Sequence, residues 1–137
     1  MTGREPDAHG TPVRRFTDPA YRPLAPDLAG IRREIDRIDE EIVRLLAERA
    51  MYVKDAARFK RDAFQVSAPA RQAQVFAHVR ALAERHNPDF NGGFDGLPEV
   101  VEAAYRALVA GYIACEQNYF GQTEPAGNEN SPEKDNK

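Results

Sequence analysis

Two cations, Arg49 and Lys60, interrupt an apolar stripe within residues 28–60, a stretch that contains no proline. On a helix with 3.6 residues per turn their spacing is about three turns plus 20°, so we expect both side chains to point the same way, roughly 16 Å apart along the axis. A buried cation without a partner is costly. The pair therefore needs either a protein carboxylate or a ligand with separated anionic groups.

Other polar residues fit the same site. Arg71 and Gln72 precede the apolar face of a second predicted helix, and Glu116 interrupts the apolar face of a third. The sequence offers this site no cysteine, serine–histidine pair or metal-ligand cluster, so we expect cofactor-free chemistry that depends on positioning and electrostatic stabilisation. Guanidinium groups match carboxylates bidentately, which predicts a small polycarboxylate as the substrate. The expected floor consists of the small side chains Val53, Ala56 and Ala57.

A long amphipathic helix must hold the two cations. Asp27 follows Pro26 and is placed to cap its first turn. If the helix runs over residues 28–60, it is about 50 Å long. A folded unit of about 95 residues has a radius of gyration near 13 Å, so we expect the helix to be covered by a second chain. Its apolar residues recur in steps of three and four: Leu28, Ile31, Ile35, Ile38, Ile42 and Leu45.

Two more helices complete the predicted all-α fold of three helices per chain. One begins at Pro69 and ends before Asn87–Pro88, and the other opens around Pro98 and runs to Phe120. Residues 61–68 are expected to be a connector. We expect one helical domain over residues 27–120, with flexible tails at 1–26 and 121–137, because both tails lack a periodic apolar pattern.

The composition argues against several classes of protein. The net charge is −3, whereas nucleic-acid-binding domains usually have a basic face. No apolar run approaches the roughly 18 residues of a membrane span, and the N-terminus lacks the apolar core of a signal peptide. Cys115 is the single cysteine. It excludes an intrachain disulfide and fits a reducing cytoplasm.

Several segments together resemble the all-helical chorismate mutase family. They lie between about Leu28 and Phe120: LAGIRREIDRIDEEIVRLLAER, continued by YVKDAARFK, then Pro69-Ala70-Arg71, and YIACEQNYF in the last helix. Within them, YVKDAARFK and the pairs Tyr112-Ile113 and Tyr119-Phe120 are most similar to the branch that contains the isochorismate pyruvate lyases of salicylate synthesis.

The resemblance implies an intertwined homodimer with two active sites, each of which takes one arginine from the start of the partner's long helix. Here that arginine is Arg32. It lies about 25 Å from Arg49 on a rigid helix, too far for both to hold one small molecule. The family pattern assigns Arg49 to a substrate carboxylate, Lys60 to the ether oxygen and a carboxylate, and Arg71 to a further cationic contact. Further substrate contacts are expected from Gln72, Val53, Ala57, Tyr112 and Ile113.

The implied reaction is the rearrangement of chorismate to prephenate in aromatic amino acid metabolism, during which negative charge builds on the ether oxygen. Lys60 would stabilise this charge, and Glu116 would help only when protonated. Gln72 stands where many mutases have a glutamate that holds the ring hydroxyl. Glu116 stands, as in fungal mutases, where bacterial members have a glutamine. A one-residue insertion would bring Gln117 there instead, but the gap-free register favours Glu116.

Three functions remain open from the sequence. The first is a chorismate mutase, and the second is an isochorismate pyruvate lyase that uses the same pocket. Gln72 favours the mutase because the lyases tend to be apolar at that position, whereas the local similarity favours the lyase. The third is a helical dimerisation module without catalytic activity.

Overall fold

The computed structural model describes residues 4–127, and every regular element in this range is helical. Three long helices carry the fold: α1 (Leu28–Ala56), α3 (Pro69–His86) and α4 (Leu97–Phe120). The short elements η1 (Ala57–Phe59), α2 (Ala63–Ser67) and η2 (Asn87–Asp89) connect them. The predicted all-α class with three long helices is confirmed. No helix within the described range is long and apolar enough to cross a membrane.

Helices α3 and α4 form the core of the chain. Val75, Phe76 and Val79 of α3 and Val109 of α4 are buried against one another, and Tyr105 is among the partly buried residues packed on them. These residues lie on the apolar faces predicted for the two helices. The α3–α4 pair is therefore a rigid wall on which a site can be built.

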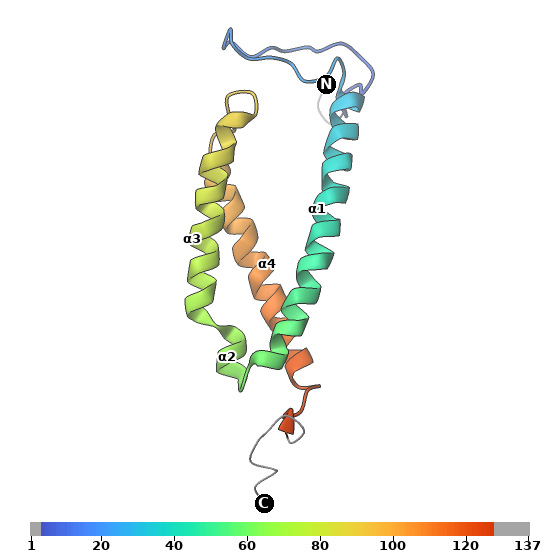
Figure 1. The fold of residues 1–137 in the computed structure, drawn as a ribbon. Helices are drawn as coiled ribbons and strands as arrows, with labels where there is room; N and C mark the ends of the chain where they lie inside the picture. Colours follow the sequence, from blue (N-terminus) through green and yellow to red (C-terminus); the bar gives the residue numbers. More distant parts are fainter. Residues whose placement is uncertain (1–3, 128–137) are drawn as a thin grey trace, which may run out of the picture.

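Helix α1 stands apart from this core along most of its length (Figure 1). Only Gly30 of its 29 residues is buried. The helix approaches α4 near its C-terminal end, where the Tyr112 hydroxyl donates a hydrogen bond of 2.7 Å to the Leu46 carbonyl. Its aliphatic stripe is open to solvent in the single chain. Ile31, Ile35, Ile38, Ile42 and Leu45 are 39 to 52% exposed.

The prediction that this helix runs to Lys60 is wrong. Helix α1 ends at Ala56, the 3-10 turn η1 follows, and Lys60 takes an extended conformation. Continuing α1 beyond Ala56 competes with starting a new helix, α2. The Asp62 carboxylate caps α2 by accepting a hydrogen bond of 2.9 Å from the Gln65 amide. The expected connector over residues 61–68 therefore contains a short helix.

The N-terminal segment, residues 4–27, joins the free end of α1 to the loop between α3 and α4 (Figure 1). The Ala29 amide donates to the Ala8 carbonyl at 2.8 Å. The Arg22 backbone exchanges two hydrogen bonds with the Asn91 side-chain amide, at 3.2 and 2.9 Å. Asn91 has a φ of 52°, a conformation that asparagine tolerates better than most residues. Asp27 caps α1 by accepting a 2.8 Å hydrogen bond from the Gly30 amide, as predicted.

Candidate active site

A pocket of about 320 Å³ lies between the C-terminal part of α1, the η1–α2 segment and the α3–α4 wall. This volume is at the small end of the range for sites that bind small molecules. Eight of the ten residues predicted for the site line it: Arg49, Val53, Lys60, Arg71, Gln72, Tyr112, Ile113 and Glu116. They come from four separate parts of the chain, so the fold brings together residues that are far apart in sequence.

Lys60 and Glu116 form an ion pair inside the pocket. The Lys60 Nζ donates to Glu116 Oε2 at 2.9 Å. The two side chains are 21% and 5% exposed, so little water competes for this contact. The turn at η1 makes the pair possible, because it directs the chain at Lys60 away from the axis of α1 and toward α4. Glu116 is the single buried charged residue among those the structure describes.

Arg49 is held by aromatic rings rather than by an acid. Its guanidinium carbon lies 5.6 Å from the ring centre of Tyr105 and 5.3 Å from that of Tyr112. Cation–π contacts of this geometry orient the guanidinium without neutralising it. Within residues 4–127 neither Arg49 nor Arg71 forms a salt bridge. The pocket thus presents three cations and one acid, a balance that suits an anionic ligand.

The Gln72 amide has a fixed orientation. Its Nε2 donates a 2.6 Å hydrogen bond to the Ser67 carbonyl at the end of α2. A carbonyl oxygen can only accept, so the amide nitrogen must face Ser67. The side-chain oxygen of Gln72 is therefore left to accept a hydrogen bond from a hydroxyl group of a ligand.

Two predicted site residues lie elsewhere. Ala57 is 2% exposed and belongs to the core, whereas Ala56, which was also expected in the floor, lines the pocket. The turn η1 causes this difference, since it rotates Ala57 relative to a continuous helix. Arg32 lies near the other end of α1, outside the pocket of its own chain.

Gln117 supports α2 and does not line the pocket. Its Nε2 donates to the Ala63 carbonyl at 3.0 Å and approaches Ser67 Oγ at 3.4 Å. Of the two candidates for this place, the geometry therefore brings Glu116 to the pocket and gives Gln117 the role of fastening α2 to α4.

Several residues that line the pocket were not predicted as site residues from the sequence. Tyr52 lies one turn after Arg49 on the same side of α1, so helical spacing alone could have identified it. Val66 and Ser67 belong to α2, which was expected to be a connector. The remaining ones are Ala68, the residue between α2 and α3, and the wall residues Val75 and Val109.

No group of three or more histidine, cysteine, aspartate or glutamate side chains in the described part of the chain is arranged to hold a metal ion.

Comparison with known proteins gives consistent matches. The family profile described as chorismate mutase type II matches residues 31–117. A chorismate mutase of Methanocaldococcus jannaschii is 35% identical over 92 residues, which is 66% of this chain and 92% of that protein. An isochorismate pyruvate lyase of Pseudomonas aeruginosa is 36% identical over 99 residues, 72% of this chain and 90% of that protein. A bifunctional chorismate mutase/prephenate dehydratase of Aquifex aeolicus is 34% identical over 92 residues, 66% of this chain and 24% of that protein.

Proposed function

Because the chain belongs to the chorismate mutase type II family, we propose that it catalyses the rearrangement of chorismate to prephenate without a cofactor. The observation that carries this proposal is the pocket in which Arg49, Lys60 and Arg71 face a single buried acid, Glu116. Two carboxylates of the substrate would neutralise the excess of positive charge. The reaction needs the substrate to be held in a compact conformation, which separated cations can enforce.

The proposed division of roles follows the geometry. Arg49, oriented by its two tyrosines, binds one substrate carboxylate through its free donors. Arg71, in the first turn of α3, offers a further cationic contact. The oxygen of Gln72 accepts a hydrogen bond from the ring hydroxyl. Val53 and Ile113 pack against the ring.

Lys60 stabilises the charge that develops on the ether oxygen as the C–O bond breaks. The electron pair of this bond moves to the oxygen while the new C–C bond forms, so the rearrangement releases no group and needs no external oxidant or reductant. The Lys60 Nζ donates a hydrogen bond of 2.9 Å to Glu116 Oε2. A protonated Glu116 would donate a second hydrogen bond to the ether oxygen, whereas an ionised Glu116 would repel the developing charge.

A homodimer completes the site in this proposal. Helix α1 buries only Gly30 within its own chain, and the exposed stripe that begins at Ile31 is the surface on which a second copy would pack. An antiparallel pair of α1 helices would carry Arg32 to the pocket of the partner. Arg32 would then supply a fourth cation there.

Isochorismate pyruvate lyase activity is the second candidate, because a lyase is 36% identical to the chain over 99 residues. The same pocket would hold isochorismate and direct it to salicylate and pyruvate. Gln72 favours the mutase, since it places an oxygen that can accept from a ring hydroxyl at a position where the lyases tend to be apolar.

One assay tests both candidates. Purified protein is incubated separately with chorismate and with isochorismate, and prephenate, salicylate and pyruvate are quantified. We expect prephenate from chorismate as the main product. An excess of salicylate and pyruvate would show that the chain acts mainly as an isochorismate pyruvate lyase. If neither substrate gave a product, both proposed activities would be contradicted.

Removing Lys60 tests the location of the site. We expect Lys60→Ala to lower kcat by about 10²- to 10³-fold, the usual loss when one preorganised donor to a developing charge is removed. Arg61→Ala is the matched control, because it removes an exposed neighbouring cation that does not line the pocket. Near-normal turnover in Lys60→Ala would show that the reaction does not take place in this pocket.

A further inference from the structure

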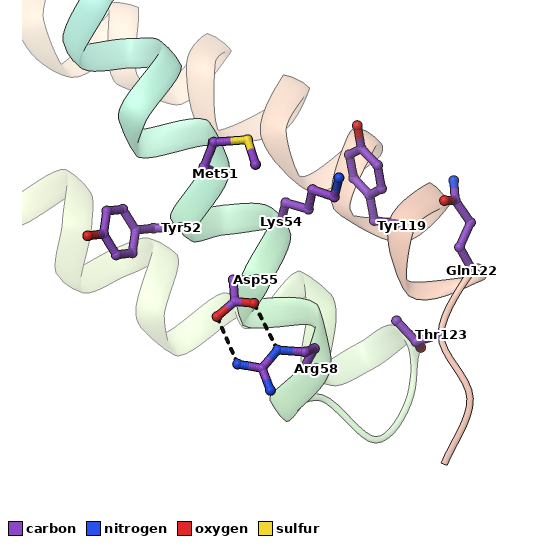
Figure 2. A pocket seen from close by; sticks show the side chains of 8 residues that line it. All are labelled: Met51, Tyr52, Lys54, Asp55, Arg58, Tyr119, Gln122 and Thr123. Carbon is purple, nitrogen blue, oxygen red and sulfur yellow. Dashed lines mark hydrogen bonds and ion pairs between the residues drawn. The ribbon is translucent and has the colours of Figure 1, made fainter. Parts of the chain in front are cut away.

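A second pocket, of about 490 Å³, lies between the C-terminal part of α1 and the end of α4 (Figure 2). Its charged groups are already engaged within the chain. Asp55 and Arg58 share two hydrogen bonds of 2.8 and 2.9 Å, and the Lys54 ammonium lies 4.6 Å from the ring centre of Tyr119. What remains open is the apolar rim on α1, where Met51 and Tyr52 are 59 and 71% exposed.

The N-terminal segment carries apolar side chains that its own chain does not cover. Val13, Phe16 and Leu24 are 94, 68 and 78% exposed. The segment also adjoins the α1 stripe directly: Val13 and Ala25 line a small cavity together with Ile31, the first residue of the stripe outside the initial turn. The segment thus extends the exposed apolar surface of α1 beyond the start of the helix.

The stripe is nearly self-complementary about Ile38. In a two-fold antiparallel pair centred there, Ile31 lies opposite the partner's Leu45, and Ile35 lies one residue from the position opposite the partner's Ile42. Such symmetry is what an isologous interface requires. Leu24 and Tyr52 are equally distant in sequence from Ile38, on opposite sides. In this register Leu28, the first residue of α1, lies opposite the partner's Glu48, so the partner's Met51 and Tyr52 extend past the end at which the N-terminal segment leaves the helix.

We propose that the N-terminal segment of each chain, through residues 12–24, packs on Met51 and Tyr52 of the partner subunit. This inference rests on the homodimer of the proposed function and adds to it an interface of which one side, residues 12–24, lies outside the family match, which begins at residue 31. Leu24 and Phe16 supply the apolar contacts. Tyr52 lines both pockets, so the segment also covers one wall of the partner's candidate active site.

Cross-linking between subunits tests the contact. Leu24→Cys and Tyr52→Cys are combined in a Cys115→Ser background, because Cys115 is an exposed thiol, and the protein is treated with a short bis-maleimide linker. Residues 28 and 52 of one chain are separated by about 36 Å of helix. A short linker cannot span this distance, so cross-linking must join two chains. We expect a covalent dimer on denaturing gels.

Each single variant in the same background is the matched control. In the antiparallel register the two thiols introduced by Leu24→Cys alone are far apart, and so are the two introduced by Tyr52→Cys alone. We therefore expect neither single variant to cross-link. An equal mixture of the two single variants should regain the covalent dimer after subunit exchange. Circular dichroism checks that the variants remain helical.

The outcomes separate this inference from the proposed function. A dimer by light scattering that does not cross-link in the double variant overturns the contact and leaves the mutase proposal intact. Cross-linking of either single variant overturns the antiparallel register. A monomer in solution that retains full activity overturns the dimer on which the inference rests.

Discussion

Arg49 has an unusual environment for a cation in the candidate site, since two tyrosine rings flank it and no acid pairs with it in the described part of the chain. A carboxylate partner would compete with the substrate, whereas an aromatic face does not. Tyr105 is the more informative of the two rings, because it contacts Arg49 without lining the pocket. If Arg49 binds substrate as proposed, Tyr105 acts on binding through Arg49.

We expect Tyr105→Leu to raise KM for chorismate by about 2- to 30-fold, the range that corresponds to losing one cation–π contact. Tyr105→Phe keeps the ring and should leave KM near the wild-type value. Steady-state kinetics of both variants, with thermal unfolding as a check on folding, measures this. An equal rise in KM for the Phe and Leu variants would contradict a role of the ring.

Glu116 is proposed to face the ether oxygen of the substrate beside Lys60, from which it accepts a 2.9 Å hydrogen bond. We expect Glu116→Gln to retain turnover, because an amide can donate a hydrogen bond to the ether oxygen and carries no charge that would repel it. Glu116→Ala leaves no such donor, and we expect it to lower kcat by about 10²-fold. Steady-state kinetics of both variants measures this, with circular dichroism as a check on folding. An equal loss of kcat in the Gln and Ala variants would reject this role.

At the scale of the helices, an ion-pair network joins α3 to α4. Arg80 of α3 bonds to Glu99 at 2.6 Å and to Glu102 at 3.0 Å. Hydrogen bonds from Arg106 and then Arg80 lower the pKa of Glu102. A hydrogen bond to its own backbone and then one from Arg80 lower the pKa of Glu99. Both carboxyl groups are thus more acidic in the folded chain than their ordinary value of 4.5.

Because the pKa values of Glu99 and Glu102 are lowered in the folded chain, their contacts stabilise the fold more at high pH than at low pH. The stabilisation is fully present above pH 4.5 and is lost as the pH falls through the lower folded-state values. We expect Arg80→Met to lower the melting temperature at about pH 7 and to have less effect at about pH 3, where the wild type has lost part of the same contact. Arg61→Met is a control on an exposed cation outside the network. An equal difference at both pH values would contradict the argument.

The sequence predicts the long helices better than it predicts the segment between them. Apolar spacing and the cap at Asp27 identify α1, and Pro69 marks the first residue of α3, because these signals act within one helix. The end of α1 depends on a competition between continuing the helix and starting a new one at Asp62. The packing of Ala57 against the core helps to decide it. Packing of this kind is tertiary and has no local signature.

The same distinction applies to the site. Lys60 and Glu116 could be selected from the sequence because each breaks an apolar face. Their direct contact could not, since it requires the turn at η1 to redirect the chain. The contacts of Arg49 with the rings of Tyr105 and Tyr112 likewise depend on where α4 crosses α1. Residue types are predictable from pattern, whereas contacts between elements follow from the fold.

As a whole, the molecule has a small core for its length. The buried apolar residues come from η1, α2, α3 and α4, and α1 contributes none of them. A helix of 29 residues that buries one glycine gains little from its own chain. Covering the exposed stripe with a second copy would supply the missing burial, and each aliphatic side chain fully buried contributes about 1.5–3 kcal/mol.

An exchange of Arg32 between subunits can be tested by mixing two inactive variants. In a heterodimer of Arg32→Ala and Lys60→Ala, the pocket of the first chain keeps Lys60 and receives Arg32 from the second, so one of its two sites is intact. Random exchange of equal amounts makes half of the dimers mixed, so we expect about a quarter of wild-type activity to return. If Arg32 served its own pocket, every site in the mixture would lack one cation, and no activity would return. Mixing Lys60→Ala with Arg49→Ala is the control: both residues line the same pocket, so no site is complete and activity should stay low.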